Sequence, residues 1–369
     1  MHHEDEIRFL RLDRCYEDHR VAYAEAHDRV LASGNVVGGE QCEKLESRLA
    51  KGCSRKNAIL VPSGTTALQI SALSLGIDPS WRIIVPAYTF LATATSLKPL
   101  AGEVVAVDVD DHYQMDVREL DGLLRIDRPT LVVAVGLFGD GLDDEALVDV
   151  VGDRATMIED GAQSFETLHT NRPGGDLGTL STLSFSPTKI TPSFGNLGAV
   201  LTCDDELAAR ARAFRRHGKR TPDMPAIGPG LNAVPNALQA SQVLHLLEHA
   251  APRRQRREDV ARSYIEAIEG SRGILPPPRR PNTRHAWHKF VIRHTRRNDL
   301  IRHLQAHGIQ TQIHYPLSID QEIHVVGIDQ DTCPNARRLA SESVSLPLYP
   351  ELLDEEVGRV CTALRTFLA

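Results

Sequence analysis

The sequence predicts an α/β protein in which a large domain, built on a mostly parallel sheet flanked by helices, precedes a small α+β domain. Three observations lead to this prediction. Short β-branched runs alternate with helical stretches over the first two-thirds of the 369 residues, as expected of βαβ units. Most of these runs are apolar at successive positions, which is typical of strands buried on both faces. Beyond about residue 236, longer helices and a proline-rich stretch replace the alternation.

The large domain is placed at residues 1–240, with strands where apolar and β-branched residues gather. These strands are predicted at residues 57–62, 82–87, 103–109, 130–137, 155–160, 179–186 and 198–202. Composition predicts a helix at 67–75, and a second helix is predicted at 204–217, where Asp204 can act as the N-cap. The N-terminal segment is also expected to be helical and able to pack on the small domain.

The small domain is placed at residues 241–369. Its predicted elements are helices at 236–250, 258–268, 298–307 and 355–368 and a strand at 286–294. The second helix can also be a continuation of the first, and a group of prolines at 276–281 interrupts regular structure after it. Acidic residues follow the basic run at 253–257. We therefore predict a solvated helix face there, with a phosphate-binding patch as the alternative.

Composition and charge exclude several classes of protein. The chain is 41% hydrophobic and 25% charged, and its net charge of −7 argues against a protein that coats nucleic acid. No apolar run approaches the ~20 residues of a membrane helix, and the N-terminus lacks the apolar core of a signal peptide. The six cysteines include no CxxC pair, and we assign no HxxxH histidine pair to a predicted helix. We therefore expect a reduced, cytoplasmic protein without a metal site, a nucleic-acid partner or a membrane partner.

Two polar segments follow predicted strands, at the sheet edge where doubly wound proteins bind ligands. Ser63 to Thr66 link a strand to a helix, and their small residues can present backbone N–H groups to a phosphate. An ordinary capped turn is the alternative for this segment. Asp160 directly follows an apolar run, where a buried carboxylate needs a cationic partner. The alternative for Asp160 is a helix cap.

A third segment ends in Lys189, one of only seven lysines in the chain. Burial lowers the pKa of a lysine and so supplies the neutral amine that a Schiff base requires, whereas a surface lysine in a loop is the alternative. Pyridoxal phosphate needs such a lysine, a carboxylate beside its pyridinium nitrogen and a cup for its phosphate. Taken together, the three segments predict pyridoxal phosphate as the cofactor.

At these residues the sequence resembles the DegT/DnrJ/EryC1/StrS family of pyridoxal-phosphate aminotransferases. The resemblance runs from about residue 34 to the C-terminus, and seven stretches carry it in the order of the family. They are SGTTALQISALSLGI (63–77), PAYTFLATATS (86–96), IEDGAQS (158–164), LSFSPTK (183–189), GAVLT (198–202), HGIQTQIHYP (307–316) and SLPLYP (345–350). The resemblance implies the fold of aspartate aminotransferase, called fold type I.

The resemblance also implies roles around the cofactor ring. Lys189 would form the Schiff base and carry the proton between the substrate carbon and the cofactor. Asp160 would keep the pyridinium nitrogen protonated. Gln163 would lie near the phenolic oxygen of the cofactor, and Phe90 would stack on its ring.

Further roles concern the phosphate and the neighbouring subunit. Gly64, Thr65 and Ser184 would form the phosphate cup. Asn232 would reach the phosphate bound by the neighbouring subunit, so that the active site would be shared between the two chains of a homodimer.

The resemblance leaves the substrate open. His314 and Tyr315 lie near the family's substrate cleft, although this His-Tyr-Pro turn can equally serve to pack the small domain. Val234 stands where the family usually has an arginine. The loss of this cation slightly disfavours a phosphate-rich substrate.

The leading prediction for the function is transfer of an amino group from glutamate or glutamine to a keto-sugar. A nucleotide-linked keto-sugar is the preferred candidate. Such a reaction would serve the biosynthesis of an amino sugar or a secondary metabolite such as an antibiotic. The alternatives are an aminotransferase for a keto-inositol or related cyclitol, pyridoxal-phosphate chemistry without net transamination, and a regulator without catalysis. The last two are disfavoured because dehydratase relatives carry histidine at the position of Lys189, and a regulator need retain neither Lys189 nor Asp160.

Overall fold

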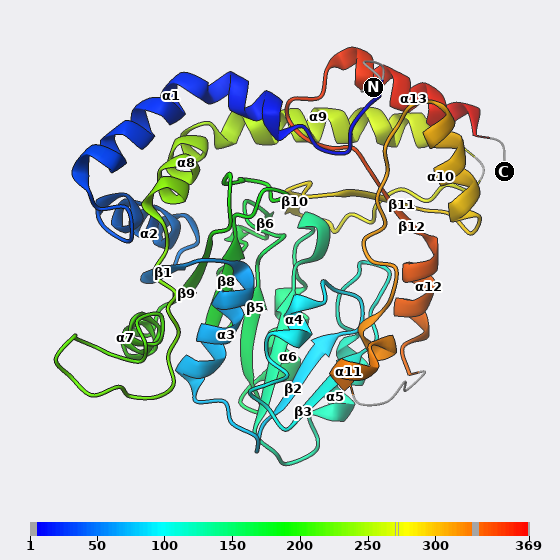
Figure 1. Ribbon diagram of the computed structural model, residues 1–369. Helices are drawn as coiled ribbons and strands as arrows, with labels where there is room; N and C mark the ends of the chain where they lie inside the picture. The colour runs from blue at the N-terminus through cyan, green and yellow to red at the C-terminus, as the bar shows by residue number, and fades with distance from the viewer. Residues whose placement is uncertain (1–5, 270, 272, 327–331, 368–369) are drawn as a thin grey trace.

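A seven-stranded sheet lies at the centre of the computed structural model (Figure 1), which describes residues 6–269, 271, 273–326 and 332–367. The strands follow the order β1-β9-β8-β5-β4-β2-β3. β9 is antiparallel to both of its neighbours, and the other pairings described for this sheet are parallel. The bounds are β1 Asn57–Val61, β2 Arg82–Pro86, β3 Glu103–Val107, β4 Thr130–Val135, β5 Thr156–Asp160, β8 Leu180–Ser184 and β9 Gly198–Thr202. The predicted mostly parallel sheet is confirmed.

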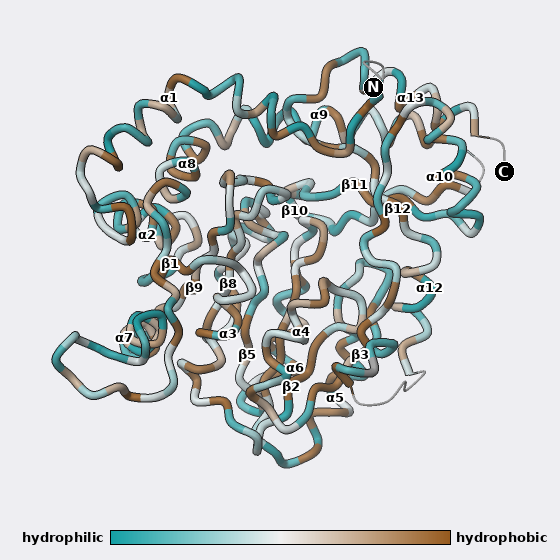
Figure 2. The backbone as a smooth tube through the Cα atoms, viewed as in Figure 1, coloured by the Kyte–Doolittle hydropathy of each residue, from teal (hydrophilic) through white to brown (hydrophobic). Residues whose placement is uncertain are grey.

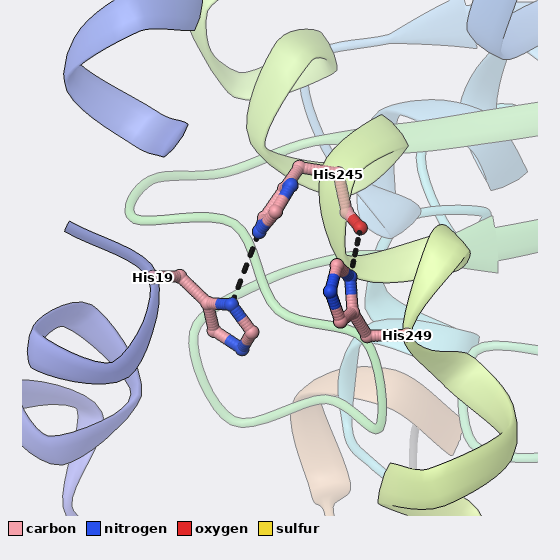
Figure 3. A group of neighbouring side chains, drawn as sticks. All are labelled: His19, His245 and His249. Atoms are coloured by element: carbon pink, nitrogen blue, oxygen red, sulfur yellow. Dashed lines mark hydrogen bonds between the residues drawn. The ribbon is translucent and has the colours of Figure 1, made fainter. Parts of the chain in front are cut away.

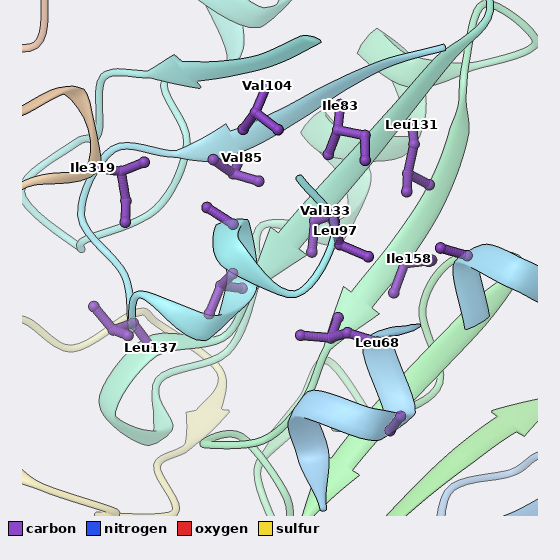
Figure 4. Packing of buried hydrophobic residues seen from close by; sticks show 14 of the residues in the cluster. Leu68, Ile83, Val85, Leu97, Val104, Leu131, Val133, Leu137, Ile158 and Ile319 are labelled. Atoms are coloured by element: carbon purple, nitrogen blue, oxygen red, sulfur yellow. The ribbon is translucent and has the colours of Figure 1, made fainter. Parts of the chain in front are cut away.

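Helices cover both faces of the sheet because side chains of successive strand residues point to opposite faces. Ile59 of β1 belongs to one apolar cluster and Leu60 to another. Figure 4 shows the first cluster, in which Leu68 and Ile158 take part, and Figure 2 shows the apolar strands inside more polar helices. The first face carries α3 (Gly64–Leu75), α4 (Ala92–Thr95) and α7 (Asp205–Phe214), and the second carries α2 (Glu40–Gly52), α5 (Val117–Leu123), α6 (Asp144–Val151) and α8 (Ala237–Glu248).

Two long helices, α1 (Leu12–Ser33) and α9 (Ala250–Ile268), lie along the upper side of the molecule in Figure 1. α1 packs on α8, and α9 packs on α13 (Asp354–Thr366). The C-terminal helix was predicted to reach Leu368, which lies outside the described residues.

The basic run at 253–257 is only partly solvated, whereas its charge pattern predicts a solvated face. Arg257 is only 4% exposed, and its guanidinium donates to the carbonyl oxygens of Trp287 and Leu348. Arg253 forms an ion pair with Glu351 at 2.6 Å. These contacts join α9 to the C-terminal part of the chain. The prediction was wrong because carbonyls and a carboxylate more than 25 residues away replace water around these side chains.

The C-terminal part has an apolar cluster of its own around the antiparallel pair β11 (Phe290–Arg293) and β12 (Ser343–Leu346), which α9, α13 and α10 (Arg297–Ala306) cover. Ile7 is fully buried in this cluster and pairs with Ile309. The N-terminal segment thus contacts the C-terminal part, while α1 itself continues onto α8.

The predicted strand at 286–294 is correct only over β11. Trp287 has a φ of 50°, which is incompatible with a strand. The Ala286 N–H donates to the Gly139 carbonyl at 2.8 Å, and the Lys289 N–H donates to the Phe138 carbonyl at 3.2 Å. These bonds hold the segment against the short helix η1 (Leu137–Gly139) that follows β4. The chain therefore turns toward the edge of the large sheet before it enters β11.

Apolar packing also crosses the domain boundary that the sequence predicts at residue 240. The boundary itself stays a prediction. Ile319 and Leu339 belong to the cluster on the first face of the large sheet. The carboxylate of Asp108 accepts from the N–H groups of Asn335 and Ala336 at 2.9 and 2.8 Å and so caps α12. The elements of this region are η2 (Ile319–Gln321), α11 (Ile323–Val326) and α12 (Pro334–Glu342), and a second small sheet consists of β6 (Leu168–His169), β7 (Arg172–Pro173) and β10 (Thr283–Arg284).

None of the helices in the described part of the chain combines the length and the apolar character that crossing a membrane requires.

Candidate active site

A cavity of about 420 Å³ opens where β1, β5 and β8 end, at the carboxyl edge of the sheet. Its volume lies within the range of roughly 300–1,000 Å³ that is usual for cofactor sites. Eight of the ten residues proposed from the sequence line this cavity: Gly64, Thr65, Phe90, Asp160, Ser184, Lys189, His314 and Tyr315. Gln163 and Asn232 are not on its wall as the structure describes it.

The turn after β1 forms an anion cup at the start of α3. The Ser63 hydroxyl accepts from the Thr66 N–H at 3.1 Å, and the Ser63 carbonyl accepts from the Ala67 N–H at 2.9 Å. The N–H groups of Gly64 and Thr65 have no acceptor within the described residues. Two unpaired N–H groups at a helix N-terminus, facing a cavity, suit a phosphate.

Glycine is required at position 64 because the turn passes close to β8. A Cβ atom there would lie 2.9 Å from the Ser184 Cβ, closer than a van der Waals contact allows. We expect Gly64→Ala to weaken pyridoxal phosphate binding roughly 10- to 100-fold, since relief of an overpacked contact that costs about 1–3 kcal/mol would move the Gly64 and Thr65 N–H groups out of position for the phosphate. Equilibrium dialysis of the cofactor measures the change. Gly358→Ala is the control, because a Cβ at Gly358 meets nothing within 4 Å; equal affinities for both variants would remove Gly64 from the phosphate site.

Asp160 ends β5 with its carboxylate buried in the cavity wall. The Thr93 hydroxyl donates to Oδ2 at 2.9 Å, and the Ala162 N–H donates to Oδ1 at 3.2 Å. Burial raises the pKa of Asp160, and these hydrogen bonds and Lys189 oppose that rise. A cation bound against this carboxylate would favour its charged form.

The neighbouring carboxylate, Glu159, faces away from this cavity. Its oxygens accept from the N–H groups of Gly175 and Leu177 at 2.8 and 2.7 Å, so it anchors the loop before β8. Burial raises the pKa of Glu159 to about 7. The alternation of side chains along β5 therefore separates a structural carboxylate from one available to a ligand.

Lys189 lies half-buried in the loop after β8, on the wall of the same cavity as Asp160. Burial lowers the pKa of its amine to about 8, against the opposing charge of Asp160. A substantial fraction of this amine is therefore neutral near pH 8, as nucleophilic attack on a carbonyl requires.

A hydrogen-bonded chain supports the far wall of the cavity. The Gln163 amide donates to the Tyr315 hydroxyl at 3.1 Å, and its oxygen lies 3.0 Å from His288 Nδ1. The other nitrogen of His288 lies 3.2 Å from the Thr188 carbonyl, next to Lys189. Gln163 thus lies behind Tyr315, where it orients cavity residues.

Aromatic side chains stand at the mouth. The ring of Phe90 is 50% exposed and lies 5.7 Å from the ring of Tyr315. The Tyr88 hydroxyl donates to the His314 carbonyl at 2.6 Å and accepts from the Tyr315 N–H at 2.8 Å. An exposed aromatic face such as that of Phe90 is available to a flat ligand ring.

Sequence reasoning missed His288 and Lys289 on the cavity wall. Lys289 is 8% exposed, its amine lies 4.9 Å from the centre of the Phe9 ring, and no acidic side chain of the described residues pairs with it. Burial and the charges of Lys189 and Arg257 lower its pKa to about 7. A rare lysine inside the apolar run WHKFVIR was the available signal.

Asn232 lies apart from the cavity. It is exposed and forms an isolated antiparallel bridge with Arg216. The expected contact with a neighbouring subunit stays a prediction, since it concerns a second chain.

The residues present fit pyridoxal phosphate. Two unpaired N–H groups at the cavity wall are available to the phosphate, the buried carboxylate of Asp160 is available to a ring nitrogen, and the half-buried amine of Lys189, with a lowered pKa, lies on the same wall. These are the three groups that this cofactor requires of a protein.

Comparisons with known proteins agree with this geometry. The model of the DegT/DnrJ/EryC1/StrS aminotransferase family matches residues 18–365. The dTDP-3-amino-3,4,6-trideoxy-alpha-D-glucose transaminase of Streptomyces venezuelae is 32% identical over 97% of this chain and 95% of that protein. The UDP-2-acetamido-2-deoxy-3-oxo-D-glucuronate aminotransferase of Pseudomonas aeruginosa is 31% identical over 91% and 93%. The crystal structure of DesV from S. venezuelae has a TM-score of 0.93, with 32% identity and 98% coverage of both chains.

Proposed function

Because this chain belongs to the DegT/DnrJ/EryC1/StrS aminotransferase family, and is therefore a pyridoxal-phosphate-dependent aminotransferase, we propose that it transfers an amino group from glutamate or glutamine to a nucleotide-linked keto-sugar. The names of two relatives that align over more than nine-tenths of the chain, one a dTDP-sugar and one a UDP-sugar enzyme, support this substrate class. We further propose a homodimer in which the exposed Asn232 reaches the neighbouring subunit's site, and a role in the biosynthesis of an amino sugar or an antibiotic.

Each side chain of the cavity has a definite task in this proposal. Bound pyridoxal phosphate supplies a carbonyl carbon that receives the amino group and a ring that takes up electrons. Lys189 would offer its neutral amine to that carbonyl and would carry a proton to and from the substrate carbon. Asp160 would hold a proton on the ring nitrogen. The N–H groups of Gly64 and Thr65 would hold the phosphate, and the exposed ring of Phe90 would be available to the cofactor ring.

Lys289 supplies a positive charge for the amino donor. Glutamate and glutamine both carry an α-carboxylate, and a buried ammonium without an acidic partner gains by pairing with it. Of the two lysines on the described cavity wall, Lys289 is the one left for this role, because Lys189 is assigned to the cofactor.

We expect Lys289→Met to raise the KM for the donor roughly 10- to 100-fold, because a hydrogen bond to a charged group contributes about 1.5–3 kcal/mol. The donor half-reaction, followed as loss of visible cofactor absorbance, measures this. The charged form of Lys289 predominates below its pKa of about 7. The wild-type KM for the donor should therefore rise with pH above about 7, and the variant should lose this dependence.

Lys98→Met is the control, since Lys98 lies outside the cavity wall as described and should leave the KM unchanged. A rise in KM confined to the keto substrate would contradict the assignment of Lys289 to the donor.

The proposed function is tested with the purified holoenzyme. Glutamate and glutamine are added separately, and conversion of the cofactor to its amino form identifies the donor. The converted enzyme is then offered dTDP- and UDP-linked keto-sugars and keto-inositols, and its molecular mass is measured in parallel. Turnover of a nucleotide-linked keto-sugar by a dimer is expected. Turnover of keto-inositols alone would replace the proposed substrate with a cyclitol, and no conversion by either donor would contradict the proposed donors.

A further inference from the structure

Three histidines from two distant segments meet outside the active site (Figure 3). His19 lies on α1, His245 lies in the last turn of α8, and His249 lies between α8 and α9. One ring nitrogen of each can be chosen so that all three lie within 4.8 Å of one another. His245 and His249 have the HxxxH spacing, with His245 in α8 and His249 directly after its last residue. We propose that these imidazoles bind a divalent transition-metal ion such as Zn²⁺.

The ring positions suit a shared ion. His245 Nε2 lies 3.0 Å from His19 Nδ1, and the ring centres of the three pairs are 4.7 to 5.1 Å apart. Two nitrogens bound to one Zn²⁺ at about 2.0–2.1 Å in tetrahedral geometry are themselves separated by about 3.3 Å. An ion can therefore replace the hydrogen bond between His19 and His245 after a small movement, once the ring that donates this bond carries its proton on its other nitrogen.

His249 is already oriented as a metal ligand. Its Nδ1 lies 3.1 Å from the carbonyl oxygen of His245, to which it donates (Figure 3). That bond places the proton on Nδ1 and leaves the lone pair on Nε2. Donation of the second ring N–H to a backbone carbonyl is the usual support of a metal-bound histidine.

The positive charge beside the three rings is compensated by an ion pair. Arg253 is the positive charge beside His19, but it pairs with Glu351 at 2.6 Å. Three imidazoles select Zn²⁺, Cu²⁺ or Ni²⁺ over Mg²⁺ or Ca²⁺, which prefer oxygen ligands. The half-buried position of all three rings leaves room for a water as the fourth ligand.

An ion here would join α1 to the junction of α8 and α9. His19 and His249 are 230 positions apart by their residue numbers, so the ion would close a long loop of chain. The site shares no residue with the cavity that contains Lys189. Its expected effect is therefore on stability, with aminotransferase activity unchanged.

The test uses untagged holoenzyme, freed of metal with a chelator and titrated with ZnCl₂ by calorimetry. We expect one Zn²⁺ per chain with a dissociation constant in the micromolar range or tighter, and a rise in Tm on binding. Loss of a contact that only supports a metal ligand lowers metal affinity roughly 10–100-fold. His19→Ala and His249→Ala each remove a ligand, so each should weaken Zn²⁺ binding by more than this and should abolish the rise in Tm. Circular dichroism and the activity without metal verify that each variant is folded. His249→Gln is used in place of an alanine variant that does not fold.

His303→Ala is the matched control. His303 and His307 form a second HxxxH pair, with ring centres 4.4 Å apart, but His303 Nε2 is already 2.9 Å from the Ala363 carbonyl. This pair also belongs to no group of three potential ligands among the described residues. Three results would each overturn the proposal. They are loss of Zn²⁺ binding in His303→Ala, full Zn²⁺ affinity in both His19→Ala and His249→Ala, and millimolar Zn²⁺ binding by the wild type.

Discussion

Replacing Lys189 with alanine is expected to lower amino transfer by several orders of magnitude and to remove the visible absorbance of lysine-linked cofactor. Lys189 is half-buried on the same cavity wall as Asp160, and partial removal from water lowers the pKa of its amine to about 8, so it supplies both a nucleophile and a proton carrier. Alanine supplies neither of these. The measurements are a spectrum of the variant after dialysis with pyridoxal phosphate and the rate of amino transfer.

The control for this experiment is Lys289→Met, because Lys289 carries the other lysine amine on the same cavity wall and is itself buried. Lys289→Met should keep the visible absorbance that Lys189→Ala loses. If Lys189→Ala keeps that absorbance and Lys289→Met loses it, the two lysines have exchanged the roles proposed above.

Replacing Asp160 with asparagine is expected to leave pyridoxal phosphate bound and to lower turnover roughly 100-fold or more, the usual contribution of a placed proton-holding group. Asparagine has the shape of aspartate and can still accept from Thr93, which donates to Oδ2 at 2.9 Å. It carries no charge to hold a proton on the ring nitrogen. Cofactor affinity and turnover are measured on the same preparation.

Glu159→Gln is the matched control, one residue earlier on β5. Glu159 faces the other side of the strand and anchors the N–H groups of Gly175 and Leu177, so its substitution should affect stability while turnover stays near the wild-type value. Near-normal turnover of Asp160→Asn would contradict the proposed role of Asp160, and equal losses in both variants would point to a general structural effect.

Much of the fold could be predicted because its signals are local. Apolar β-branched runs predicted all seven strands of the large sheet, since a strand buried on both faces needs apolar residues throughout. β1, β5 and β8 run in the same direction, so the residues that follow them meet at one edge. For this reason Gly64, Asp160 and Lys189 could be grouped before the structure was known.

Other features depend on contacts that no local pattern contains. The strand predicted at 286–294 is shortened because Ala286 and Lys289 bond to a turn after β4, about 150 positions earlier. The basic run at 253–257 is partly buried because Arg257 finds carbonyl acceptors in the C-terminal part. Charge patterning could not reveal either partner.

The sequence by itself determined the family, the parallel sheet and the residue types at its carboxyl edge, because motif order and hydrophobic periodicity are properties of the chain. Only the tertiary structure decided that Glu159 anchors the loop before β8, that Lys289 joins Lys189 on the cavity wall, and that His19 meets His245 and His249. The physical reason is the same in each case. The environment of a side chain is set by segments that folding brings together across long stretches of sequence, and burial, charge and hydrogen bonding act over a few ångströms of space.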